Sequence, residues 1–96
     1  MMQSIPLQAV PSQIVAVYLG TQACTLIVQQ KSTGLFLSLY VSNTLVIGGV
    51  LCLNATKIVR SAYLGFTGDL AFYDTAGSDD PDYTGLGGRY MLAYVS

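Results

Sequence analysis

Residues 35–54 read LFLSLYVSNTLVIGGVLCLN, and the interpretation of this stretch decides the fold class of the chain. The stretch carries no charge and is about as long as a membrane-spanning helix must be. Its middle holds the triplet Ser42–Asn43–Thr44, which is costly in hydrocarbon, and the pair Gly48–Gly49 weakens a helix further. Residues 35–41 instead alternate with the period of a strand, and the polar triplet follows them as a turn would. The stretch therefore predicts a β-hairpin that bends or bulges at its glycine pair.

The rest of the chain consists of similar short runs, rich in Val, Ile, Leu, Tyr and Thr and bounded by Gly, Asn, Ser or Pro. Besides the hairpin strands at 35–41 and 44–54, these runs predict strands at 13–19, 23–30, 57–66, 69–74 and 89–96. A turn or two of helix has room only within residues 54–63, where β-branched residues disfavour it. We expect one all-β domain over residues 1–96, a small antiparallel barrel or sandwich of about six to seven strands. A closed barrel would remove the aggregation-prone strand edges.

Apolar residues are too numerous for the chain to bury them all within itself. Of its 96 residues, 52% are hydrophobic and 9% charged, against roughly 25% charged in an ordinary domain. In residues 13–19 both alternating sets are apolar, which is typical of a strand that lies between two apolar layers. A domain of this size has a large surface relative to its volume. We therefore expect another copy, a different protein or lipid to cover part of it, and we favour protein because residues 35–54 do not form a plausible membrane span.

Charge and histidine content argue against several classes of function. The net charge is −1, and the four basic residues are scattered, at Lys31, Lys57, Arg60 and Arg89. Nucleic-acid binding through a basic patch is therefore not expected. Histidine is absent, which removes the commonest general base and the commonest metal ligand. We expect no enzyme activity.

Two cysteines, Cys24 and Cys52, are too few for a disulfide scaffold and do not form a CxxC pair. We expect both to be small buried residues with free thiols, in preference to a bridge. Residues 1–13 carry no basic residue and include two prolines, which does not fit a signal peptide.

The segment DDPDYTGLGGRY, residues 79–90, is the one place that suggests site chemistry. Its aspartates could offer oxygen ligands to calcium, but their spacing matches neither the EF-hand loop nor the calcium-binding nonapeptide repeat. Its glycines lack the following Lys-Ser/Thr and helix that a phosphate-binding loop needs. The proline instead predicts a type I turn over residues 80–83, and the glycines predict positive φ and close backbone approach.

We expect no catalytic residue, no metal site and no cofactor in this segment. An acid–base pair of Asp69 and Asp74, at the two ends of one predicted strand, would be too widely separated for a tight dyad. We interpret residues 79–90 as an assembly loop. Its candidate partner-contacting residues are Asp80, Pro81, Tyr83, Leu86, Arg89 and Tyr90.

Six blocks of the sequence form a recognisable pattern: IPLQAVPSQ (5–13), GTQAC (20–24), TGLFLSLYV (33–41), VIGGVLCLN (46–54), YLGFTGDLAFYDTAG (63–77) and DDPDYTGLGGRYMLAY (79–94). Together they resemble the phage baseplate plug family, small proteins of contractile-tailed bacteriophages. The last two blocks carry most of the specificity. The resemblance implies a structural virion component at the centre of the tail baseplate, where hub, tube-end and spike proteins meet, and it implies no catalytic motif.

The resemblance implies a structural protein of a contractile phage tail baseplate, made in the host cytoplasm, and this agrees with the burial of apolar surface against partners that composition predicts. It would pack at the central hub and tube end and contribute to assembly or sealing of the tail. The expected partners are hub, tail-tube and spike proteins, and further copies of the chain in a ring. Two alternatives are a small membrane-associated protein using residues 35–54 and a calcium- or ligand-binding β module using residues 74–88.

Overall fold

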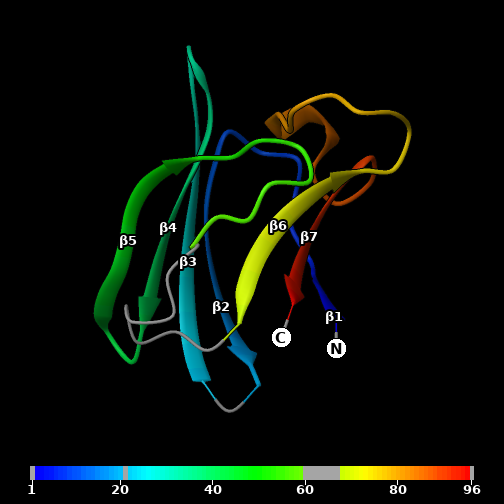
Figure 1. The fold of residues 1–96 in the computed structure, drawn as a ribbon. Coiled ribbons are helices and arrows are strands. Elements are labelled where there is room, and N and C mark those ends of the chain that lie inside the picture. The colour runs from blue at the N-terminus through cyan, green and yellow to red at the C-terminus, as the bar shows by residue number, and fades with distance from the viewer. Residues whose placement is uncertain (1, 21, 60–67, 96) are drawn as a thin grey trace.

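The computed structural model describes residues 2–20, 22–59 and 68–95, and strands make up most of it (Figure 1). The strands are β1 (Met2–Ile5), β2 (Ser12–Leu19), β3 (Gln22–Lys31), β4 (Gly34–Val41), β5 (Thr44–Leu51), β6 (Asp69–Asp74) and β7 (Tyr90–Val95). A short 3₁₀ helix, η2 (Tyr83–Gly85), precedes β7. The all-β prediction is confirmed.

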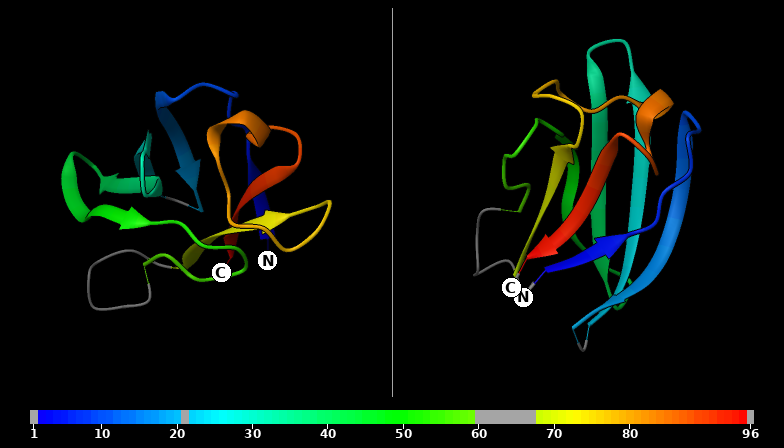
Figure 2. Two further views of the ribbon diagram at one scale, coloured as in Figure 1. Left: turned by 90° about the horizontal axis from the view of Figure 1, so that it is seen from above. Right: turned by 90° about the vertical axis from the view of Figure 1, so that its right-hand side faces the viewer.

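The strands form two antiparallel sheets packed against each other, with strand orders β2-β3-β4-β5 and β1-β7-β6 (Figure 2). The sandwich prediction is confirmed, and the barrel alternative is wrong because no ladder of described strands joins the two sheets. The edge of β6 is covered by a loop instead of a strand. The N–H of Ala55 donates to the Phe72 carbonyl at 2.7 Å, and that of Ile58 donates to the Leu70 carbonyl at 2.8 Å. The edge is thus protected without closure.

The stretch 35–54 forms the predicted hairpin, in which β4 pairs with β5. Ser42 and Asn43 connect the strands with φ values of 50° and 67°. Positive φ at both central residues is the pattern of the tight type I′ hairpin turn, and Asn tolerates it well. Among the described residues, no helix has the length and apolar character needed to cross a membrane.

The glycine pair produces the predicted bulge in β5. Leu37 pairs with Val50 and Leu39 with Ile47, so the two glycines lie opposite the single residue Ser38. Gly49 has a φ of 59°, and its N–H donates to Ser38 Oγ at 2.9 Å. The hydroxyl therefore satisfies a backbone donor that the bulge removes from the ladder.

The remaining predicted strands are confirmed for the most part. Those at 13–19 and 23–30 are β2 and β3, which pair with each other, and those at 69–74 and 89–96 correspond to β6 and β7. The prediction at 44–54 was too long, because the strand ends at Leu51.

The strand predicted at 57–66 falls mostly outside the described residues, and its described part, 57–59, is not a strand because Ile58 and Val59 N–H groups donate to Asp69 Oδ1. The short strand β1 was missed, since its sequence MQSI has little strand character of its own. It forms through pairing with β7.

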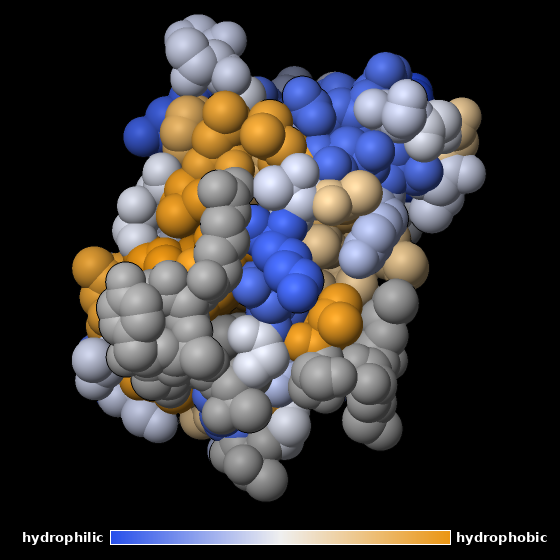
Figure 3. All heavy atoms as spheres, in the orientation of Figure 1, coloured by the Kyte–Doolittle hydropathy of each residue, from blue (hydrophilic) through white to orange (hydrophobic). Residues whose placement is uncertain are grey.

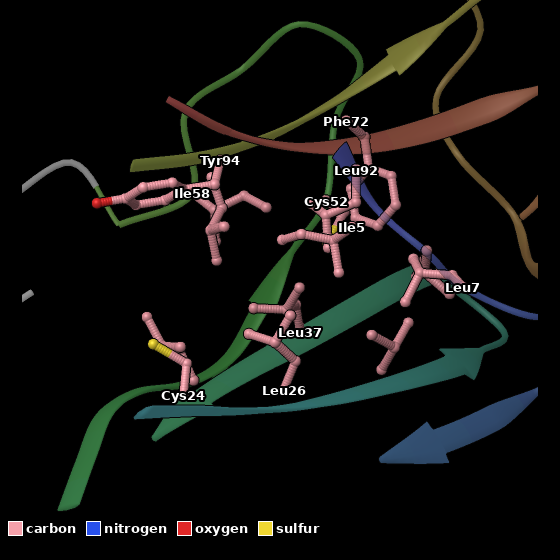
Figure 4. Close-up of a cluster of buried hydrophobic side chains, with 14 of the residues drawn as sticks. Ile5, Leu7, Cys24, Leu26, Leu37, Cys52, Ile58, Phe72, Leu92 and Tyr94 are labelled. Atoms are coloured by element: carbon pink, nitrogen blue, oxygen red, sulfur yellow. The ribbon is translucent and has the colours of Figure 1, made fainter. Parts of the chain in front are cut away.

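The core lies between the facing sides of the two sheets (Figure 4). Leu26 and Leu37 of one sheet point toward Phe72 and Leu92 of the other, and all four side chains are fully buried. Packing of interdigitating apolar side chains from two sheets is the usual source of stability in a sandwich.

Both cysteines are buried in this core and carry free thiols, as predicted. Burial raises the pKa of the Cys52 thiol to about 12 and also raises the pKa of Cys24. Both groups are therefore neutral thiols at physiological pH, with little of the thiolate that reacts with oxidants or metals.

Candidate functional site

The β6–β7 loop, taken here as residues 74–90 so that it includes the last residue of β6 and the first of β7, is organised around one arginine. Arg89 donates from Nε to Asp74 Oδ1 at 2.8 Å and from Nη2 to Asp74 Oδ2 at 2.7 Å. The same Nη2 donates to Asp79 Oδ2 at 2.9 Å. The two-point contact between Arg89 and Asp74 fixes the geometry of both planar groups. It ties together the residues at which the loop leaves β6 and approaches β7.

Asp74 is the most heavily used carboxylate of this loop. Besides the two bonds from Arg89, it accepts the backbone N–H groups of Ala76 and Asp79, each at 2.9 Å. Hydrogen bonding from the Arg89 guanidinium holds the pKa of Asp74 well below its usual range. Asp74 is therefore ionised at neutral pH, but its oxygens are occupied in shaping the loop.

Asp80 and Asp82 are also used by the local structure. Asp80 Oδ1 accepts the N–H of Asn54 at 2.9 Å, which joins the loop to the segment after β5. Asp82 Oδ1 accepts both the N–H of Thr84, at 2.9 Å, and the Thr84 hydroxyl, which caps η2. The type I turn predicted over residues 80–83 is wrong, because Asp82 is extended, with φ −133° and ψ 166°.

No metal centre is assembled from the residues that the structure describes. Among them, no three His, Cys, Asp or Glu side chains group closely enough to hold an ion. Asp69, the remaining carboxylate, accepts the N–H groups of Ile58, Val59 and Leu70 at 2.7–3.1 Å. The aspartates thus act as hydrogen-bond acceptors for N–H groups of the backbone and for Arg89.

The glycines of the loop allow close approach, as predicted, but the neighbour lies within the same chain. Gly87 has a φ of 80°, and a β-carbon there would collide with the backbone carbonyl of Leu7. A β-carbon at Gly85 would lie 2.5 Å from Tyr90 Cδ2. These positions let the loop pack on the segment after β1 and on the start of β7.

The six predicted contact residues divide by exposure. Asp80 and Arg89 are exposed and Tyr83 is half-buried. The other three, Pro81, Leu86 and Tyr90, are buried, and the Arg89 guanidinium lies 5.2 Å from the centre of the Tyr90 ring. The exposed members are available to a partner, whereas the buried ones support the shape of the loop. Their role in partner contacts stays a prediction.

The second candidate site is the side of the four-stranded sheet that faces away from the core, here called the outer face. On β2 it presents Ile14 and Tyr18, which are 71% and 68% exposed, and on β5 it presents Leu45 and Leu51, at 53% and 38%. Between them lie outward residues of β3 and β4: Thr25, Ile27, Phe36, Ser38 and Tyr40. The outer face is therefore largely apolar.

The alternation in residues 13–19 predicted this two-sided character. Val15 and Val17 pack against the core, while Ile14, Ala16 and Tyr18 point outward. The outer-face residues were not predicted as a site from the sequence, although the alternation in residues 13–19 could have identified those on β2. Figure 3 shows, on one side of the molecule, how β5 and the β6–β7 loop differ in hydropathy: hydrophobic atoms run along β5, and hydrophilic atoms gather over the loop.

Comparison with known families identifies the chain as a whole. Residues 2–96 match the family described as "Cyanophage baseplate Pam3 plug gp18", whereas no curated protein matches. The match spans both sheets and the β6–β7 loop. The resemblance to baseplate plug proteins is thus confirmed. The chain belongs to the baseplate plug family of Pam3 gp18 and is a structural component of a phage tail baseplate.

Proposed function

We propose that this protein packs at the centre of the baseplate, at the hub and the end of the tail tube, and contributes to assembly or sealing of the tail. Its partners would be hub, tail-tube and spike proteins, together with further copies of itself in a ring. The protein would be made in the host cytoplasm and act in the virion. The family description, which names a baseplate plug, supports this position.

One observation carries the proposal: two large side chains, Ile14 and Tyr18, stand exposed on an apolar sheet face. A contiguous apolar patch of this kind on a small domain marks an interaction surface. A protein that works inside a large assembly has neighbours to cover such a face. The outer face fits a packing role better than a role in which the chain acts alone.

The β6–β7 loop would provide a second, polar contact. In this proposal the exposed side chains of Asp80 and Arg89, with Tyr83, contact a neighbouring baseplate protein. Pro81, Leu86 and Tyr90 hold the loop in the shape that the partner recognises. Arg and Tyr are enriched in protein interfaces, which supports this choice of residues.

A cryo-electron microscopy reconstruction of intact tails that carry this protein tests the proposed position. We expect its density on the tail axis, in contact with the tube end and the hub. Density confined to the baseplate periphery would refute the central position while leaving the family assignment intact. A tagged protein whose label decorates the baseplate in the same place provides the control for chain assignment.

A further inference from the structure

The outer face has a regular pattern of large and small residues. Across the sheet, Ala16 of β2 pairs with Thr25 of β3, Thr25 with Tyr40 of β4, and Tyr40 with Leu45 of β5. The end of this row on β2 and β3 is built from the small residues Ala16 and Thr25, and the end on β4 and β5 from large ones. Ile14 and Tyr18, two positions before and after Ala16, project on either side of it.

Two neighbouring hollows accompany these projections. One, of about 300 Å³, is lined by residues that include Ala16, Tyr18 and Thr25. The other, of about 280 Å³, is lined by Ile14, Ile27 and Tyr40 together with Thr25. One face therefore carries both projecting apolar side chains and adjoining hollows. A surface that associates with an identical surface needs both features, because each copy must offer what the other lacks.

Charge does not oppose contact between two such faces. The only charged residue in β2–β5 is Lys31, at the end of β3, where its Nζ lies 5.4 Å from the centre of the Phe36 ring. A two-fold axis through the middle of the face would put the two Lys31 residues at opposite ends. An eight-residue strand is about 26 Å long, which exceeds the screening length of about 8 Å at physiological salt.

The size of the face is sufficient for a specific pair. Four strands spaced about 4.8 Å apart and about 26 Å long give a footprint of about 500 Å² on each copy. Two copies together would bury about 1,000 Å², the lower bound for a specific protein interface. Sheets also stack well on each other, at about 10 Å with interdigitating side chains.

We propose that two copies of this chain pack face to face through the outer faces of their four-stranded sheets, with Ile14 and Tyr18 of each copy entering the hollows of the other. This inference rests on the proposed function only in that the protein works in more than one copy. A two-fold contact closes on itself, so a ring would be built from such pairs through other surfaces. The Ser, Thr and Asn side chains interspersed on the face suit a protein partner better than lipid.

The test compares the unaltered protein with Ile14→Lys, which places a charge on a side chain that would enter a hollow of the other copy. Because Ile14 is exposed, this variant is expected to keep its fold, which far-UV circular dichroism checks. In sedimentation equilibrium at about 100 µM, the original protein should show twice the mass of 10.2 kDa. Ile14→Lys should weaken association at least tenfold. Ser78→Lys adds the same charge in the exposed β6–β7 loop and should pair normally.

A dilution series of amide NMR spectra maps the contact without any variant. The shifts that change with concentration should cluster on β2–β5, at outward positions such as Thr25 and Tyr40. A monomer at 100 µM, or pairing that Ile14→Lys leaves unchanged, would overturn the inference. So would a monomer that binds phosphatidylcholine vesicles through this face. If the pair exists and Ile14→Lys abolishes it, incorporation of this variant into tails would show that the baseplate function does not depend on the pair.

Discussion

The β6–β7 loop and the outer face of the four-stranded sheet differ in how the fold uses them. The loop holds most of the carboxylates of the chain, yet Asp74, Asp80 and Asp82 accept hydrogen bonds from nearby groups of the same chain. The outer face has almost no charge, and its largest side chains, Ile14 and Tyr18, are exposed. The carboxylates that look reactive in the sequence are used in hydrogen bonds within the chain, whereas apolar residues that look like core residues are exposed to solvent.

The difference follows from what each region needs in order to fold. A long loop has many backbone N–H groups without a strand partner, and carboxylates and Arg89 satisfy or organise them. A sheet satisfies most of its backbone groups by pairing, so fewer side chains are needed for that purpose on its outer face, where Ser38 accepts the N–H of Gly49. The outer face is therefore less constrained by the fold than the loop, whose residues take part in the local hydrogen bonding.

The largest expected effect separates the two sides of the sheet. Leu37→Ala removes a fully buried side chain from the core and should lower the free energy of unfolding by about 2–5 kcal/mol. Ile14→Ala, on the outer face, should change it by no more than about 0.5 kcal/mol. Urea denaturation at a concentration low enough to avoid association measures both. Similar losses for the two variants would contradict the division into inner and outer faces.

The next effect concerns the glycines of the loop. Gly87→Ala should destabilise the protein by about 1–3 kcal/mol, because the residue has positive φ and a β-carbon would press on the Leu7 carbonyl. Gly88→Ala is the matched control, since its β-carbon would meet only the Gly85 carbonyl oxygen at an ordinary 4.0 Å. Thermal unfolding should therefore show a clearly lower midpoint for the first variant than for the second.

A smaller, pH-dependent loss is expected when the central carboxylate of the loop is neutralised. The pKa of Asp74 is lower in the folded protein than in the unfolded chain, so the ionised group stabilises the fold above its ordinary pKa, about 4. That contribution is lost as the pH falls below this value toward the lower folded-state pKa. Asp74→Asn should therefore have a lower unfolding temperature at pH 7, and the gap from the original protein should narrow below pH 4.

The matched control for this prediction is Asp79→Asn, which removes one ion pair of Arg89 at a carboxylate that is 71% exposed. Its effect at pH 7 should be smaller, because exposed ion pairs are well screened by water. A gap between Asp74→Asn and the original protein that stays constant from pH 7 to pH 2 would show that the charge of Asp74 is not what stabilises the loop.

How far the sequence predicts this molecule depends on whether a feature is local. The hairpin and its bulge were predictable because Ser42–Asn43 and Gly48–Gly49 determine backbone geometry by themselves. The strand β1 and the conformation of Asp82 were not, since β1 depends on pairing with the distant β7 and Asp82 on capping η2. Likewise, the alternation in β2 predicted an outer apolar face, but its hollows arise only when β2, β3, β4 and the turn after β4 are assembled.

The smallest expected effect on stability is at Leu45, where a substitution tests whether the outer face serves association and not folding. Leu45→Ser changes an exposed residue at the far edge of the outer face, so the free energy of unfolding should shift by no more than about 0.5 kcal/mol. If the outer face serves association, the same change should weaken pairing several-fold, because it removes apolar area from the contact. Sedimentation equilibrium and urea denaturation of one preparation measure the two quantities. A variant that loses stability but pairs normally would mean that the edge of the outer face serves the fold, as the loop does.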